Sequence, residues 1–195
     1  MSVINNKMFI GITGGSASGK TLICNNIQQR TKKKVVVLSG DYWYKNHNKN
    51  FDHPGAFDVD EMLDCIKRLK NKQPATHPVY DYLTHSRTNV LVEIPDADCY
   101  IFEGILMLHD PRIRAEFDYK IFVDAAPDTR LIRRITRDIR ERGRTLDDVI
   151  AQHVSTVEPG YKKYILPTKE YANFVIQNNS NTFEDSIVKF IANAI

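Results

Sequence analysis

Cysteine is scarce in this chain of 195 residues, and tryptophan occurs once. The three cysteines, Cys24, Cys65 and Cys99, lie far apart, so no pair has the spacing of a zinc site or of a disulfide framework. The chain also lacks an apolar run long enough to span a bilayer, and its N-terminus lacks the pattern of a signal peptide. These absences predict a cytoplasmic protein with reduced thiols and no membrane partner.

An excess of one charge is missing as well. The chain has 27 Lys and Arg against 24 Asp and Glu, a formal net charge of +3. Such a balance excludes a strong general attraction to nucleic acid. The sequence also has no internal repeat and no low-complexity linker, and its length fits one α/β domain.

What the sequence does contain is a phosphate-binding loop. Residues 14–21 match G-x-x-x-x-G-K-[ST] at every fixed position, between a short apolar run and a helical pattern. We expect Lys20 to reach the β- and γ-phosphates of ATP or GTP and Thr21 to bind Mg²⁺. The backbone N–H groups of the whole loop should surround the phosphates. The loop consists of Gly14, Gly15, Ser16, Ala17, Ser18, Gly19, Lys20 and Thr21.

Apolar runs and helical patterns alternate along the chain. Five runs predict strands, at 8–13, 34–39, 99–103, 119–123 and 173–177. Helical patterns separate most of them, at 20–31, 59–71, 127–141, 145–154 and 183–194. This alternation predicts an α/β fold of the P-loop NTPase type, in which helices sandwich a parallel five-stranded sheet. A β-rich segment at 76–94 breaks the alternation and predicts an inserted hairpin.

Carboxylates follow three of the predicted strands. Ligands of parallel sheets bind beyond the carboxyl ends of the strands, so Asp41, Glu103 and Asp124 are candidates for Mg²⁺ or for proton transfer. Glu103 is the better candidate for organising the metal, because the third strand should lie beside the loop-bearing strand. Asp124 fits a structural turn, and Asp41 fits either a base or a turn aspartate.

Arginines are concentrated between residues 130 and 144. In the helix predicted there, Leu131, Ile135 and Asp138 share one side and arginines occupy the rest, which by itself is typical of a solvated face. A phosphoryl transition state, however, needs extra cations. The segment 130–154 is therefore predicted to form an arginine-rich lid.

Several collinear stretches resemble the uridine kinase (uridine–cytidine kinase) family of P-loop kinases. The resemblance includes the phosphate loop, the Asn-Phe-Asp-His-Pro segment at 50–54, the hairpin and the arginine run, and it spans nearly the whole chain. It implies a single P-loop kinase domain over 1–195, with a nucleoside-binding hairpin at 76–94. The implied reaction is 5′-phosphorylation of uridine and cytidine in pyrimidine salvage.

The same resemblance implies roles by position. The residues implied as catalytic are Asp41 as general base, Lys20, Arg137 and Arg142. Those implied to bind the triphosphate, besides the loop, are Arg134, Arg142 and Arg144. Those implied to bind the nucleoside are Tyr44, Phe51, Asp52, Tyr80, Tyr82, His85, Arg137 and Gln152. The implied metal ligands are Thr21, Glu103 and Asp41.

The chain departs from the family pattern in four places. Leu22 replaces a hydroxyl residue, Gly40 replaces a common Gln, Tyr82 replaces a usual Phe, and the segment 45–50 is short. None removes a group that the chemistry requires. A related kinase acting on nicotinamide riboside, phosphoribulose or pantothenate, a GTP-dependent switch, and an inactive nucleotide-binding regulator remain alternatives. The family also implies a homo-oligomer, a tetramer.

Overall fold

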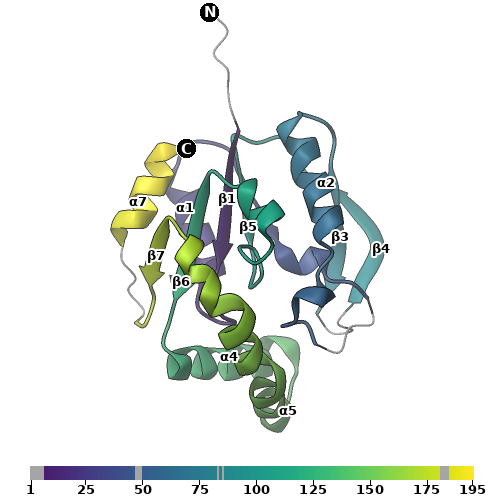
Figure 1. Cartoon of the computed structure of the whole chain (residues 1–195), viewed down its shortest axis with the longest axis vertical. Coiled ribbons are helices and arrows are strands. Elements are labelled where there is room, and N and C mark those ends of the chain that lie inside the picture. The colour runs from purple at the N-terminus through teal and green to yellow at the C-terminus, as the bar shows by residue number, and fades with distance from the viewer. Residues whose placement is uncertain (1–6, 47–49, 83, 85, 181–184) are drawn as a thin grey trace, which may run out of the picture.

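The fold is built on a parallel sheet of five strands. The structure is a computed structural model, and it describes residues 7–46, 50–82, 84, 86–180 and 185–195. The strands are β1 (Met8–Thr13), β2 (Val35–Ser39), β5 (Cys99–Glu103), β6 (Tyr119–Asp124) and β7 (Phe174–Gln177). Their order across the sheet is β2-β5-β1-β6-β7, so the loop-bearing β1 lies at the centre, as Figure 1 shows. The predicted fold class is confirmed, and β5 lies beside β1 as expected.

Helices cover both faces of this sheet. Side chains alternate along each strand, so Ile10 and Ile12 point to one face and Phe9 to the other. The first face is covered by α1 (Lys20–Arg30) and α7 (Asp185–Ala194), and the second by α2 (Val59–Lys70) and α3 (Pro111–Ala115). Each fully buried aliphatic side chain in these two layers stabilises the fold by about 1.5–3 kcal/mol.

All three cysteines are free and buried in these layers. Burial raises the pKa of Cys65 to about 12 and that of Cys99 to about 12 as well. Thiols with such pKa values remain protonated and unreactive near neutral pH. They contribute to packing rather than to chemistry.

The inserted hairpin is present between α2 and β5. It consists of β3 (Thr76–Asp81) and β4 (Ser86–Glu93), which pair antiparallel and lie beside α2 in Figure 1. The ring of His77 stacks on that of Tyr42, with centroids 4.1 Å apart and planes 9° apart. This contact fixes the hairpin to η1 (Gly40–Trp43), the turn that follows β2.

The arginine run forms α4 (Pro127–Arg142), which ends at Gly143 with φ +62°. After α5 (Leu146–Gln152) the chain stays helical through Tyr171, beyond the predicted end at 154. This part comprises η3 (His153–Val157), α6 (Glu158–Gly160), η4 (Tyr161–Ile165) and η5 (Leu166–Tyr171). It persists because Val157, Tyr161 and Ile165, spaced four apart, are all buried. The sequence also did not predict α3 or the short η2 (Pro54–Ala56).

α4 and α5 lie at the end of the sheet to which β1 points (Figure 1).

Within the described ranges, no helix is both long and apolar enough to cross a membrane.

Candidate functional site

A cavity of about 400 Å³ lies at the carboxyl ends of the strands. The phosphate loop, η1, the hairpin, β5, α4 and α5 all contribute to its walls. The lining residues are Ser16, Ala17, Gly19, Lys20, Thr21, Ser39, Asp41, Tyr44, Phe51, Asp52, Tyr80, Tyr82, Glu103, Gly104, Ile105, Arg133, Arg134, Arg137, Arg142, Arg144 and Gln152. The structure thus brings together most of the residues that the sequence singled out.

The phosphate loop is held from outside by a residue far along the chain. Gly19 has φ +97°, and a Cβ on it would lie 2.1 Å from Nδ2 of Asn178. The buried Asn178 side chain donates a hydrogen bond of 2.7 Å to the carbonyl oxygen of Ser18. The loop therefore needs glycine at this position both for its backbone angle and for the close approach.

Lys20 is buried at the base of the loop. Its ammonium donates to the carbonyl oxygens of Gly14 and Gly15, at 3.1 and 3.0 Å. Burial lowers the pKa of Lys20, and the nearby carboxylates of Glu103 and Asp41 oppose that effect. Because the ammonium of Lys20 is buried, negative charge in the cavity is needed to stabilise its positive charge.

Two carboxylates meet the loop from neighbouring strands. The hydroxyl of Thr21 donates to Oε1 of Glu103 at 3.1 Å, and Glu103 ends β5. Burial raises the pKa of Glu103, against the lowering effect of Lys20. Asp41 lies in η1, where its backbone N–H donates to the Ser39 hydroxyl at 3.3 Å. Asp124 does not line the cavity and instead pairs with Lys169, as a structural residue would.

Asp52 lies at another wall of the cavity and is only 5% exposed. Its Oδ2 accepts a hydrogen bond of 3.1 Å from the Thr156 hydroxyl. Burial raises the pKa of Asp52, while the charge of Arg134 works in the opposite direction. A Cβ on Gly160 would lie 2.6 Å from Cβ of Asp52, so this glycine permits the helical segment to approach the carboxylate.

Aromatic rings form the wall next to these carboxylates. Tyr44 and Phe51 contact edge to face at 5.2 Å, and Tyr80 and Tyr82 do so at 5.2 Å. Tyr44 and Tyr80 connect the two pairs, with centroids 6.3 Å apart. Such a wall suits a planar ring. The predicted base-reading residue His85 lies outside the described residues.

Four arginines of α4 line the cavity: Arg133, Arg134, Arg137 and Arg142. Arg130 and Arg134 are 2% and 7% exposed, whereas Ile132 on the same helix is 64% exposed. A solvated face, the usual meaning of such a run, therefore does not describe the inward side of α4. The physical reason is that the buried guanidinium groups find partners: Arg134 donates to the Ser16 hydroxyl at 2.9 Å and to Gln152 at 2.8 Å.

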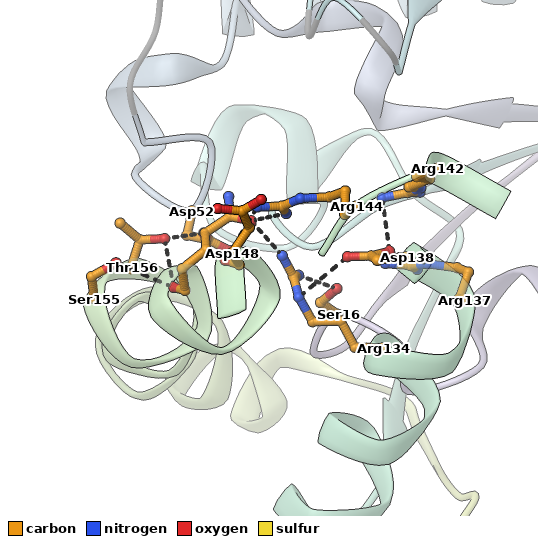
Figure 2. A network of polar contacts seen from close by, with 11 residues as sticks. Ser16, Asp52, Arg134, Arg137, Asp138, Arg142, Arg144, Asp148, Ser155 and Thr156 are labelled. Atoms are coloured by element: carbon orange, nitrogen blue, oxygen red, sulfur yellow. Dashed lines mark hydrogen bonds and ion pairs between the residues drawn. The ribbon is translucent and has the colours of Figure 1, made fainter. Parts of the chain in front are cut away.

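Figure 2 shows the polar network around these arginines. Asp138, fully buried, faces Arg134, Arg137 and Arg142, while Arg144 contacts Gln152. The side chain of Arg137 pairs with Asp138, and Arg134 is the arginine whose charge acts on Asp52. The network therefore joins the phosphate loop to the wall that holds Asp52.

Sequence reasoning missed several residues of the site. The cavity is also lined by Ser39, Gly104, Ile105 and Arg133. Arg130 supports the loop from behind, since a Cβ on Gly15 would lie 2.7 Å from its Nη1, and its guanidinium stacks 3.7 Å from the ring centroid of Tyr161. Ser39 was detectable as a helix N-cap before Asp41. Gly104 and Ile105 directly follow Glu103, and Arg133 lies in the arginine run, so these residues also had a local signal. The support that Arg130 gives to the loop depends on contacts between distant segments, for which the sequence has no local signal.

Comparison with known proteins shows which protein family this chain resembles. The profile of the phosphoribulokinase/uridine kinase family matches residues 9–183. A uridine kinase of Lactiplantibacillus plantarum is 45% identical over 177 residues, covering 86% of this chain and 85% of the relative. The uridine kinase of Bacillus subtilis (strain 168) is 42% identical over 181 residues, covering 88% and 86%.

Solved structures share the fold at low sequence identity. Phosphoribulokinase from Rhodobacter spheroides has a TM-score of 0.66 at 19% identity, covering 89% of this chain and 70% of its own. A protein described as a possible uridine kinase from Bacillus stearothermophilus has a TM-score of 0.61 at 20% identity, covering 87% and 88%. These likenesses concern the arrangement of strands and helices.

Proposed function

We propose that this chain, which belongs to the phosphoribulokinase/uridine kinase family, is a uridine and cytidine kinase that phosphorylates the nucleoside 5′-hydroxyl. One observation carries the proposal: Lys20 of the phosphate loop, Asp41 and Asp52 line one cavity together with an aromatic wall. The cavity thus combines a site for a triphosphate with a site for a sugar and a planar base. The products are UMP or CMP and a nucleoside diphosphate.

The donor is a nucleoside triphosphate, ATP or GTP, bound by residues 14–21. Its phosphates accept hydrogen bonds from the loop N–H groups, and Lys20 exchanges its contacts with Gly14 and Gly15 for the phosphate oxygens. The lowered pKa of Lys20 supports this role, because a buried ammonium is stabilised by the negative charge that the donor brings.

The residues around Thr21 fit Mg²⁺. Thr21, Glu103 and Asp41 provide oxygen donors, which this hard cation prefers, and Thr21 already contacts Glu103. Among the described residues no group of three or more His, Cys, Asp or Glu forms a metal cage, which suits an ion held largely by phosphate and water. When bound, Mg²⁺ neutralises charge that develops on the transferred phosphoryl group.

Asp41 is the general base. The 5′-oxygen forms the new bond to the γ-phosphorus while the bond from that phosphorus to the β–γ bridging oxygen breaks. The hydroxyl proton passes to the Asp41 carboxylate, and the nucleoside diphosphate leaves. Arg137 and Arg142 face the cavity from α4 and stabilise the charge of the phosphoryl group, with Arg134 and Arg144 beside them.

Asp52 accepts hydrogen bonds from the ribose 2′- and 3′-hydroxyls. Its burial supports this role, because a buried carboxylate gains much from two hydroxyl donors and rejects a sugar that lacks one. Phe51 and Tyr82 pack on the pyrimidine, and Tyr44 completes the aromatic wall. Tyr80 and His85 read the edge of the base, and Gln152 lies close to the nucleoside.

The chain acts as one kinase domain over residues 1–195, with the hairpin 76–94 binding the nucleoside and the segment 130–154 closing as a lid. By family resemblance it assembles as a homotetramer in the cytoplasm, without nucleic acid as partner. Light scattering of the purified protein tests the assembly directly.

A coupled phosphorylation assay tests the function. Uridine, cytidine, deoxyuridine and nicotinamide riboside are each offered with ATP and with GTP. Turnover of uridine and cytidine alone is the expected result. Turnover of nicotinamide riboside alone would leave the phosphate chemistry in place and overturn the role of the hairpin. Binding of triphosphate with no turnover of any acceptor would favour a regulatory protein.

A further inference from the structure

Asp138 is the one acidic residue on the inward face of α4 in the part of the chain that the structure describes, and it is fully buried. It lies four residues after Arg134 and four before Arg142, so the three side chains lie on one side of the helix. A buried carboxylate is unfavourable unless cations and hydrogen bonds compensate for the lost water. Its surroundings therefore indicate what it does.

Three guanidinium groups surround this carboxylate. Oδ1 accepts a hydrogen bond of 2.8 Å from Nε of Arg137 and lies 2.7 Å from its Nη2. The same oxygen lies 3.5 Å from Nη1 of Arg142. Oδ2 lies 3.5 Å from Nε of Arg134. Figure 2 shows the carboxylate between these side chains.

Without Asp138, the like charges on these arginines would repel one another. With it, Arg137 is held by a hydrogen bond and Arg134 and Arg142 by ion pairs, while all three side chains line the cavity. Oδ2 of Asp138 and Nε of Arg134 face each other without forming a hydrogen bond. Both residues belong to α4, so a rotation of either side chain would complete that bond.

We propose that Asp138 is the positioning residue of the lid: it aligns Arg134, Arg137 and Arg142 for the phosphoryl group without touching substrate. The inference rests on the proposed phosphoryl transfer. It gives the buried carboxylate of Asp138 an indirect function, because Asp138 acts through the arginines and does not contact the substrate. A purely structural Asp138 would instead stabilise the end of α4. That end is already held by the backbone carbonyl of Asp138, which accepts from the N–H of Arg144 at 3.1 Å and is unaffected by a side-chain substitution.

The test is a double-mutant cycle. Asp138→Asn keeps the shape but places an N–H group against the guanidinium donors. It should lower kcat by about 100-fold, because small misplacements at a reacting centre have effects of this size, and should change KM for uridine by less than about threefold. Glu141→Gln removes the same charge from an exposed position on the same helix and should change kcat by less than about twofold.

Arg142→Gln and Arg144→Gln are then measured in both backgrounds. Arg142 contacts Asp138, so its substitution should have a much smaller effect once Asp138 is Asn. The side chain of Arg144 pairs with Gln152 and does not contact that of Asp138, so its effect should depend less on the background than the effect of Arg142→Gln. Equal effects of Arg142→Gln in the two backgrounds would overturn the proposal, as would normal kcat of Asp138→Asn.

Two further measurements keep the test decisive. Should Asp138→Asn fail to fold, judged by its melting curve, the cycle is made with Asp138→Glu, which retains the charge but displaces it. The same cycle on the Kd for ATP, measured by calorimetry, needs no turnover. Coupling of Arg142 to Asp138 in ATP binding would support the inference even where the acceptor proves not to be uridine, and its absence there would contradict it.

Discussion

The hydroxyl of Tyr82 donates a hydrogen bond of 2.9 Å to Oδ2 of Asp41, so the hairpin is connected to η1, the turn that follows β2. Tyr82 is a departure from the family pattern, where phenylalanine is usual. The guanidinium of Arg142 lies over the ring of Tyr82, 4.6 Å from the ring centroid. Burial, and next the charge of Asp41, raise the pKa of Tyr82, so the hydroxyl keeps its proton and acts as a donor. One side chain thus contacts both the proposed base and an arginine of the proposed lid.

Removing this hydroxyl should reduce kcat. Tyr82→Phe keeps the ring but leaves Asp41 without the donor that orients it, and a hydrogen bond to a charged group contributes about 1.5–3 kcal/mol before solvent screening. We expect kcat to fall about tenfold while KM for uridine changes little. Tyr119→Phe, at the opposite end of the sheet, is the control. An unchanged kcat, or a loss confined to KM, would contradict an orienting role of the hydroxyl.

Asp41→Asn should reduce kcat by about 10²–10⁴-fold, the usual contribution of a general base. The amide cannot accept the 5′-hydroxyl proton, but it leaves the phosphate loop intact. The Kd for ATP, measured by calorimetry, should therefore remain within about threefold of the native value. Near-normal turnover would exclude Asp41 as the base.

Asp52→Asn should separate stability from activity. Because burial raises the pKa of Asp52, its ionised form is less favourable in the folded protein than in the unfolded chain. At pH 7 the asparagine variant should therefore melt at a higher temperature than the native protein. The difference should shrink as the pH falls toward about 4, where Asp52 takes up a proton in both states.

The same substitution should lower kcat/KM for uridine by about 10- to 100-fold, because hydrogen bonds from the ribose to a charged acceptor are lost. Discrimination against deoxyuridine should weaken with it. A variant that melts lower at pH 7, or that retains full selectivity for the ribose, would contradict the assignment.

Two glycines with left-handed backbone angles offer a matched comparison. Gly19 has φ +97° and a Cβ there would meet Asn178, whereas Gly143 has φ +62° with nothing within 4 Å of the added atom. Gly143→Ala should lower the free energy of unfolding by about 1–2 kcal/mol, the strain of the backbone alone. Gly19→Ala should lower it further and raise KM for ATP by more than tenfold, since the loop must move.

Thermal melts and ATP titrations of both variants test this comparison. Equal loss of stability in the two would show that the contact between Gly19 and Asn178 has no energetic consequence. A normal KM for ATP in Gly19→Ala would show that the loop adapts to the added methyl group.

Local sequence patterns predicted much of the fold. The phosphate-loop motif, the apolar runs and the helical periodicity predicted the five strands, the principal helices and the hairpin, because each reflects backbone angles or burial of nearby residues. The same patterns predicted that the helix ends at 154. The helical structure continues beyond that point because Tyr161 and Ile165 pack on the sheet, which a local pattern does not show.

Candidate site residues could also be predicted from the sequence where they lie at the end of a strand or match a motif. Asp41 follows β2 and Glu103 ends β5, and the order of parallel strands brings them to the loop. Their roles remain predictions, but their common location did not require a structure to foresee.

Relationships between distant segments were decided only by tertiary structure. Asn178 supports Ser18 across 160 residues, and Arg134 reaches Ser16 across 118. The inward side of α4 is charged because partners for its guanidinium groups exist on other elements, a fact that helix periodicity cannot encode. A sequence pattern records which residues are near one another along the chain, whereas the stability of a buried charge depends on every group that the folded chain brings around it.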